Sequence, residues 1–573
     1  MNYKDIYKEW VNNGYFDEDF RNELKEIEKD DKEIEDRFFK DLEFGTGGMR
    51  GVIGAGRNRM NIYNIRKATQ GFANYINHNF KNEDKLSIAI AYDSRRFSKE
   101  FALEASLVMG ANGIKTFLFD SLHSTPELSF AVRKLNCQGG IVITASHNPP
   151  EYNGYKAYDE RGCQMLPEKA DLLVDEVSKI TSFEQVKFIN EEEALKSDKL
   201  EYINENLDNE YLDMIEKLSI RPIDDLDKNL KIVFTPLHGT GGRPVAEAIK
   251  RIGIDGFYSV EEQMIPDEDF TTVNYPNPED PKAFELAIRD GKKHNADILM
   301  ATDPDSDRVG VMVNSGTGDF VRLNGNQTGA LLVSYILDGL KGKVENPLVV
   351  KTIVTSDLGK VIAESKGARV EETLTGFKFI GDKIYQYEND PMKNFVMGYE
   401  ESYGYLAGTN VRDKDAVVTS MLIAEMAAYY KKQNVSLIDV LEELYKDYGY
   451  YKEDLKSITL KGKDGLEKMG RIMSSLRSEP FDKVSGESIL EIIDCNASTI
   501  ENKNLGSVET LNLPKSNVLK YTFSDKSWFA VRPSGTEPKI KIYVSAIGAN
   551  NDLAEQKLKG IMEDVSDRLL SIG

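Results

Sequence analysis

The chain of 573 residues has few cysteines, few histidines and no long apolar run. Its three cysteines, Cys137, Cys163 and Cys495, form no Cys-x-x-Cys pair, which excludes a redox motif and a disulfide framework and favours a reducing cytoplasm. The five histidines show no zinc-ligand spacing. No apolar stretch reaches the roughly 18 residues of a membrane helix, and the polar start MNYKDIYKEW lacks a signal peptide's apolar stretch. We therefore expect a cytoplasmic protein without a membrane anchor.

Negative charge outnumbers positive charge. Lysine and arginine number 73 against 95 acidic residues, which gives a formal net charge of −22. Such a surface repels phosphate backbones and anionic lipid, so neither nucleic acid nor a membrane is the expected partner. The length is sufficient for three to five domains of about 100–200 residues each.

Short apolar runs alternate with amphipathic segments from residue 85 onwards. The pattern predicts a strand over 86–92, a helix over 98–113 and a strand over 114–120. The same order restarts near residues 230 and 328, and near 450 it changes. We predict three similar mixed α/β domains around a central cleft and a smaller C-terminal α+β domain. The expected limits are 1–218, 219–323, 324–448 and 449–573.

The segment ATDPDSDRVG (301–310) carries three aspartates, Asp303, Asp305 and Asp307, after an apolar strand. In extended chain their carboxylates lie on one side, and such hard oxygen ligands suit Mg²⁺. An EF-hand is excluded, because Arg308 and Asn314 occupy the positions that require glycine and glutamate. The alternative is an acidic surface turn. Mg²⁺ held by few protein oxygens also takes phosphate oxygens, which points to a phosphorylated substrate or residue.

Ser146 lies in GGIVITASHNPPEYNGYK (139–156), on the turn after a buried strand, where open α/β sheets place their ligands. It could accept a phosphoryl group with Lys156 as a cationic or proton-transferring partner. A serine that merely caps a turn is the alternative. A Ser–His hydrolase is disfavoured, because His147 is the adjacent residue and neighbouring side chains rarely face each other, and no GxSxG motif is present.

The segment VRPSGTEPKIKIYV (531–544) predicts an anion site. Arg532, Ser534, Thr536 and the amides around Gly535 form a donor-rich turn, followed by two lysines on one face of a strand. A solvated hairpin turn is the alternative.

The segment GYEESYGY (398–405) places Glu400, Glu401 and Ser402 between aromatic residues. Paired hydroxyl acceptors beside aromatic walls suit a sugar, although an edge strand packed by tyrosines would look similar. The segments TLTGFKFIG and RDKDA could add further contacts.

Two glycine-rich segments, FGTGGMRG and HGTGGRP, complete no GxGxxG motif, and GxxxxGK[ST] is missing from the sequence. Nucleotide binding therefore has little support. Arg50, at the end of the first segment, could meet an anionic group.

Taken in order, TASHNP, DPDSDR, GYEES and RPSGTEPKIKIY resemble the α-D-phosphohexomutase superfamily over roughly residues 40–550. The length, GTGGMRG and GFKFIG resemble the phosphoglucomutase/phosphopentomutase branch more than the shorter phosphomannomutases. The resemblance implies four domains around a central cleft. It also implies that Ser146 is a phosphoserine whose phosphate completes a site for one Mg²⁺ with Asp303, Asp305 and Asp307.

The same resemblance implies roles for individual residues. Arg50, His147, Lys156 and Arg308 match positions for phosphoryl transfer and proton movement. The positions that match substrate contacts are Thr375, Gly376, Glu400, Ser402 and Lys414, and those that match a distal phosphate clamp are Arg532, Ser534, Gly535 and Thr536. Tyr399 and Ala416 stand where glycine is usual, which leaves the sugar preference open.

The activity implied is interconversion of α-D-glucose 1-phosphate and glucose 6-phosphate, with glucose 1,6-bisphosphate as intermediate and activator. Mannose or pentose phosphates would be served by the same machinery. A Mg²⁺-dependent phosphatase and an inactive phosphosugar-binding protein are the alternatives from other classes. We expect a small sugar phosphate as the partner, and a monomer or weak homodimer.

Overall fold

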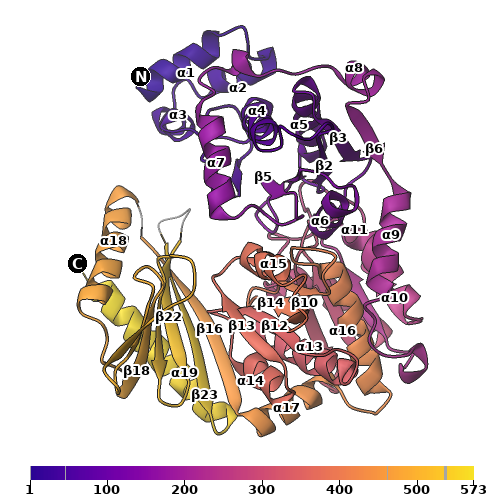
Figure 1. The fold of residues 1–573 in the computed structure, drawn as a ribbon, viewed down its shortest axis with the longest axis vertical. Coiled ribbons are helices and arrows are strands. Elements are labelled where there is room, and N and C mark those ends of the chain that lie inside the picture. Colours follow the sequence, from indigo (N-terminus) through magenta and orange to yellow (C-terminus); the bar gives the residue numbers. More distant parts are fainter. Residues whose placement is uncertain (1, 46, 461, 535–538, 573) are drawn as a thin grey trace.

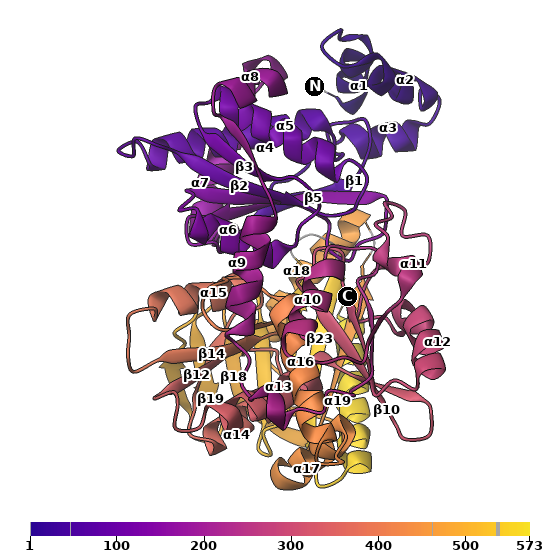
Figure 2. The ribbon, with the colours of Figure 1, turned by 90° about the vertical axis from the view of Figure 1, so that its right-hand side faces the viewer.

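The computed structural model describes residues 2–45, 47–460, 462–534 and 539–572. Four units follow one another along the chain. The first lies at one end of the molecule, above the second and third, and the fourth packs beside the third (Figures 1 and 2). The predicted fold class, three mixed α/β units and a C-terminal α+β unit, is confirmed. The domain limits given above stay our proposal, and each of the four sheets formed by the described residues lies inside one of these ranges.

Domain I is built on a six-stranded sheet of order β1-β5-β4-β2-β3-β6. Its strands run parallel except β1 and β5, which pair antiparallel with each other, and β5 also with β4. The strands are β1 (Gly48–Val52), β2 (Ser87–Tyr92), β3 (Lys115–Phe119), β4 (Gly139–Ile143), β5 (Tyr152–Asp159) and β6 (Leu200–Ile203). The helices are α1 (Tyr3–Asn12), α2 (Glu18–Glu26), α3 (Asp31–Phe38), α4 (Ile62–Asn79), α5 (Ser98–Ala111), α6 (Thr125–Lys134), α7 (Pro167–Ser178), α8 (Glu191–Lys196) and α9 (Glu205–Glu216).

Domains II and III repeat the same construction with smaller sheets, of order β11-β10-β9-β7-β8 and β13-β12-β14-β15. Domain II contains β7 (Ile232–Thr235), β8 (Phe257–Ser259), β9 (Ile298–Thr302), β10 (Val309–Asn314), β11 (Phe320–Leu323), α10 (Gly242–Arg251), α11 (Glu261–Met264) and α12 (Glu285–His294). Domain III contains β12 (Pro347–Thr352), β13 (Arg369–Thr373), β14 (Asn394–Tyr399), β15 (Tyr405–Ala407), α13 (Gly325–Leu340), α14 (Leu358–Ser365), α15 (Phe377–Gln386), α16 (Ala416–Lys431) and α17 (Leu437–Tyr448).

Domain IV is a largely antiparallel sheet with two long helices, drawn in orange and yellow in Figure 1. The strands are β16 (Tyr450–Thr459), β17 (Lys483–Val484), β18 (Glu487–Asp494), β19 (Thr499–Asn502), β20 (Ser507–Thr510), β21 (Leu519–Phe523), β22 (Trp528–Pro533) and β23 (Lys539–Gly548), and the helices are α18 (Gly462–Ser478) and α19 (Asn551–Ser571). A buried apolar cluster that includes Ile353 and Trp528 joins it to domain III. None of the helices formed by the described residues has both the length and the apolar character needed to span a membrane.

The same strand–turn–strand arrangement occurs in domains I, II and III. In each, one parallel strand turns back into an antiparallel partner: β4 into β5, β9 into β10 and β14 into β15. The turns between these strands are the three segments from which the sequence predicted the serine, metal and sugar loops. The antiparallel returns were not expected from the alternation of strands and helices, because β5, β10 and β15 follow their partners without a helix.

Candidate active site

Contacts between the domains bring the three hairpin turns together. The Ser146 hydroxyl donates to Asp303 Oδ2 across the interface between domains I and II, at 2.8 Å. Domain III joins them through the backbone, since Val309 N–H donates to Tyr403 O at 3.1 Å. Segments more than 150 residues apart in the sequence therefore form one site.

Ser146 adopts the left-handed backbone conformation, with φ of +52°, and its side chain is buried. Its Oγ lies 3.1 Å from His147 Nδ1, so the expectation that these neighbours do not face each other is wrong. Burial lowers the pKa of His147 well below its usual value, and the nearby Arg308 lowers it further. The imidazole is therefore neutral at pH 7 and adds no positive charge to the site.

The three aspartates of the metal loop are buried, and one ligand oxygen from each lies within 4.8 Å of the others. The loop is a turn with a left-handed Ser306, not the extended chain that the sequence predicted. At an effective dielectric constant of about 20, two carboxylates at this separation repel each other by about 3.5 kcal/mol. Burial, Asp307 and Asp305 together raise the pKa of Asp303 well above its usual value.

Three cations from different domains face this loop. Lys156 Nζ lies 2.7 Å from Asp305 Oδ2 and 3.4 Å from Asp307 Oδ2, and Lys414 Nζ lies 3.1 Å from Asp307 Oδ2. Arg308 pairs with Glu279 and lies 3.7 Å from Asp307 Oδ1. Burial works to raise the pKa of Asp307, but Lys414 and Lys156 outweigh it and hold that pKa below its usual value.

The residues present fit a divalent cation. The lysines contact the Oδ2 oxygens, whereas Oδ1 of Asp305 and Oδ1 of Asp307 are buried without any hydrogen-bond partner among the described residues. An unsatisfied buried carboxylate oxygen is costly, and hard oxygen ligands in this number suit Mg²⁺. Asp303, Asp305, Asp307 and Ser146 are therefore the residues that could hold it.

A glycine-rich turn in domain II packs against the metal loop. A Cβ on Gly239 would lie 2.4 Å from Pro304 Cα, and one on Gly241 would lie 2.5 Å from Thr302 Oγ1. The Thr240 N–H between them donates to Pro304 O at 2.8 Å. The glycines of HGTGGRP thus allow this turn to pack closely against the metal loop.

Arg95, which sequence reasoning missed, holds the Ser146 loop. Its guanidinium donates to four backbone carbonyls of that loop at 2.5–3.1 Å, those of Ser146, Asn148, Pro149 and Tyr152. It also pairs with buried Asp93, with 3.3 Å between Nε and Oδ2. Both residues directly follow β2, so their position at the carboxyl end of a parallel strand could have indicated them.

The sugar loop of domain III carries two carboxylates, of which Glu400 is buried and Glu401 is half-buried. Glu400 Oε1 accepts from the Gly376 N–H at 2.8 Å, and burial raises the pKa of Glu400 to about 7. Glu401 Oε2 accepts from the hydroxyls of Thr352 and Thr355, at 3.2 Å each. Both carboxylates are thus bonded within domain III, Glu400 through Oε1 and Glu401 through Oε2.

The contacts of four further predicted residues differ from one another. The Thr375 hydroxyl is buried without a hydrogen-bond partner among the described residues, and Ser402 is half-buried. Lys414 contacts Asp413 as well as the metal loop, so the structure connects it to the aspartates more directly than to the sugar loop. Arg50, exposed on β1, donates to Asn148 Oδ1 at 3.1 Å.

Domain IV contributes cations to the same region. Arg532 lies directly across from Lys541 in the β22–β23 ladder. Burial lowers the pKa of Lys541, and Arg532 lowers it further. The same two causes lower the pKa of Lys378 in domain III, a residue that sequence reasoning did not assign to the site. The Ser534 N–H donates to Lys539 O, and the predicted clamp residues Gly535 and Thr536 lie outside the described residues.

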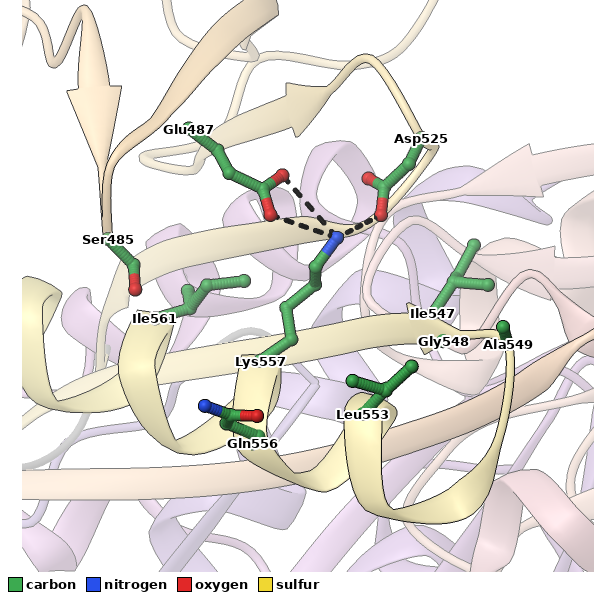
Figure 3. Close-up of a pocket in the computed structure, with 10 residues that line it drawn as sticks. All are labelled: Ser485, Glu487, Asp525, Ile547, Gly548, Ala549, Leu553, Gln556, Lys557 and Ile561. Atoms are coloured by element: carbon green, nitrogen blue, oxygen red, sulfur yellow. Dashed lines mark hydrogen bonds and ion pairs between the residues drawn. The ribbon is translucent and has the colours of Figure 1, made fainter.

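A cavity of about 660 Å³ in domain IV is separate from these loops (Figure 3). It lies at the far end of β23 from Lys541, beside the start of α19. Lys557 crosses it and pairs with both Glu487 and Asp525, so its charge is already compensated. The predicted site residues do not line this cavity.

Comparison with known proteins gives consistent matches along the chain. Four models described as Phosphoglucomutase/phosphomannomutase match it in order: α/β/α domains I, II and III at 41–184, 209–316 and 324–448, and the C-terminal domain at 495–556. A protein named Phosphoglucomutase from Staphylococcus saprophyticus is 37% identical over 518 residues, which cover 90% of this chain and 93% of that one. A protein of the same name from Staphylococcus aureus is 38% identical over 533 residues, 92% and 94% of the two chains.

Among solved structures, pp63/parafusin (phosphoglucomutase) from Paramecium aligns with a TM-score of 0.67 at 18% identity, covering 92% of this chain and 95% of that one. A phosphoglucomutase/phosphomannomutase family protein from Burkholderia thailandensis aligns with a TM-score of 0.64 at 18% identity, covering 92% and 96%. These likenesses show the shared fold.

Proposed function

The chain belongs to the phosphoglucomutase/phosphomannomutase family, and from this premise we propose that it interconverts α-D-glucose 1-phosphate and glucose 6-phosphate. The observation that carries the proposal is the meeting of Ser146 with the metal loop, at 2.8 Å between Oγ and Asp303 Oδ2. A nucleophilic hydroxyl, three buried carboxylates and three cations in contact are what phosphoryl transfer requires, because it depends on positioning and charge neutralisation.

In the first step, phosphoserine 146 gives its phosphoryl group to the free hydroxyl of the sugar monophosphate. The P–O bond to Ser146 Oγ breaks and a P–O bond to the sugar oxygen forms. The sugar hydroxyl gives up its proton, and Ser146 Oγ takes up one proton to become a free hydroxyl. The product is glucose 1,6-bisphosphate and free Ser146. In the second step the intermediate, turned end for end, returns its other phosphoryl group to Ser146.

The residues described above supply or hold the positive charges that the transferring phosphoryl group requires. A Mg²⁺ ion held by Asp303, Asp305 and Asp307 would neutralise developing charge on phosphoryl oxygens. Burial works to lower the pKa of Lys156, but Asp305 and Asp307 outweigh it and raise that pKa, so Lys156 stays cationic at neutral pH. Arg308 is likewise held cationic by its acidic neighbours, Glu279 first among them.

Binding in two orientations requires a distal clamp that accepts either phosphate. Arg532, with Lys541 across the ladder, supplies positive charge in domain IV, and Glu400 supplies a hydroxyl acceptor in domain III. Ser402 and Thr375 add hydroxyls beside it. The segment that carries Gly535 and Thr536 completes this clamp in our proposal.

The test is a coupled assay with glucose 1-phosphate, Mg²⁺ and catalytic glucose 1,6-bisphosphate, with mannose and ribose 1-phosphates in parallel. We expect glucose 1-phosphate to be converted fastest. Ser146→Ala should abolish turnover and phosphate incorporation, whereas Ser178→Ala, at an exposed position of α7, should change neither. Release of inorganic phosphate in place of glucose 6-phosphate would identify a phosphatase and refute the proposal.

We further propose one Mg²⁺ per subunit, glucose 1,6-bisphosphate as activator, a monomer or weak homodimer, and a cytoplasmic location. These proposals rest on the sequence.

A further inference from the structure

Helix α6 of domain I begins in contact with the metal loop of domain II. Its first residue, Thr125, is fully buried, and its backbone N–H donates to Asp305 O at 2.9 Å. The Thr125 hydroxyl donates to Asp305 Oδ2 at 2.8 Å. Both donors therefore act on one aspartate that lies 180 residues further along the chain.

We propose that Thr125 is a positioning residue for the cation site: its hydroxyl fixes the Asp305 carboxylate so that Oδ1 is left to bind the metal. This inference rests on the proposed function, in which Asp305 is a metal ligand. Oδ2 already receives two donors, Thr125 Oγ1 and Lys156 Nζ at 2.7 Å. Oδ1 is buried and receives none from the described residues.

The position of Thr125 is itself held rigidly. Ser124 and Glu127 form a reciprocal capping box at the start of α6, with Pro126 in the first turn. His123, the residue before Ser124, contacts Ser121 O at 2.9 Å and Asp208 Oδ1 at 3.0 Å through its two ring nitrogens. A hydroxyl on so well anchored a helix end can orient a carboxylate that it contacts.

The hydrogen bond from the Thr125 hydroxyl and the one from the Thr125 backbone N–H act on different parts of Asp305. The Thr125 N–H contacts the Asp305 carbonyl and holds the loop, and it remains when the side chain is changed. Among the described residues, the Thr125 hydroxyl donates to the Asp305 carboxylate and not to the backbone of the loop. Replacing it by a methyl group removes one donor from Oδ2 at nearly constant volume, and Lys156 is left as the remaining donor. Loss of such an outer hydrogen bond to a ligating carboxylate typically costs about 10–100-fold in metal affinity.

The experiment compares Thr125→Val, Thr125→Ser and Thr116→Val in the full chain. Thr116, on β3 of the same domain, is equally buried and its hydroxyl has no hydrogen-bond partner among the described residues, so it controls for the threonine-to-valine change itself. Mn²⁺ binding is measured by titration calorimetry, with phosphate on Ser146 quantified in each preparation. Steady-state kinetics then give the Mg²⁺ activation constant and the KM for sugar phosphate separately.

We expect Thr125→Val to weaken Mn²⁺ binding about tenfold and to raise the Mg²⁺ activation constant in parallel, with the sugar-phosphate KM unchanged. Thr125→Ser should restore most of the affinity, and Thr116→Val should match the wild type. Equal Mn²⁺ affinity in Thr125→Val and Thr116→Val would overturn the inference, as would a serine variant as weak as the valine variant.

The two proposals fail separately. If the wild type converts glucose 1-phosphate while every variant binds Mn²⁺ equally, the positioning role is wrong and the proposed function stands. If the wild type converts none of the sugars while Thr125→Val still weakens Mn²⁺ binding, the proposed substrate is wrong and the positioning role stands.

Discussion

Replacing Glu400 by glutamine tests whether burial makes the charged form of this carboxylate unfavourable in the folded protein. The side chain is 5% exposed, and burial raises its pKa to about 7 from an ordinary value of 4.5, with Glu401 adding to the effect against Lys414. Glutamine keeps the oxygen that accepts from the Gly376 N–H, so the main change is loss of the charge.

The sign and size follow from linkage. Because the folded-state pKa lies above the unfolded value, folding takes up a proton, and the stability that this proton contributes is fully present below pH 4.5 and is lost as the pH rises through 7. A difference of about 2.5 pKa units corresponds to about 3 kcal/mol at 1.36 kcal/mol each. For a cooperative unit of 150–250 residues, at about 2–4 °C per kcal/mol, that is roughly 6–12 °C in Tm.

The assay is the melting temperature of wild type and Glu400→Gln from pH 4.5 to 8, in EDTA and without sugar phosphate. The Tm of the glutamine variant minus that of the wild type should rise by that amount across the range and level off above pH 7. Glu443→Gln, at an exposed position of the same domain, should show no such trend. A Tm difference for Glu400→Gln that stays constant with pH would refute the reasoning.

Three other substitutions address the remaining parts of the site. Asp305→Asn should raise the Mg²⁺ activation constant at least about tenfold and lower the rate, and an unchanged rate under limiting Mg²⁺ would contradict the metal loop. Arg532→Ala should raise the KM for sugar phosphate about tenfold or more with a smaller effect on kcat, since it removes one charged donor to phosphate, and an unaffected KM would count against the clamp. Arg95→Met should leave Asp93 as an unpaired buried charge, costing about 3–5 kcal/mol of stability, and should lower phosphate incorporation at Ser146; a normal Tm would show that the guanidinium is dispensable.

The sequence alone was sufficient to predict the fold class and the location of the loops. Hydrophobic periodicity is a local property, so the strands at 86–92 and 114–120 and the helix after 98 were predicted within a few residues of β2, β3 and α5. Motif spacing is also local, and it placed the serine, metal and sugar loops on the turns that the structure brings together. The antiparallel pairing of β4 with β5, β9 with β10 and β14 with β15 was not predicted, because strands that alternate with helices imply a parallel sheet.

Only the tertiary structure decided which atoms meet. Asp305 is bonded by Thr125 and Lys156, both from another domain, and neither contact follows from any spacing within the chain. The turn at Ser146 brings His147 Nδ1 beside Oγ, an arrangement that the sequence pattern disfavoured. The pKa of Glu400 depends on burial by segments far apart in the sequence, and so does Oδ1 of Asp305, to which no described residue donates. Desolvation and interdomain hydrogen bonds depend on segments far apart in the sequence. The order of residue types therefore identified the site residues, but it could not predict their protonation states or the orientations of their side chains.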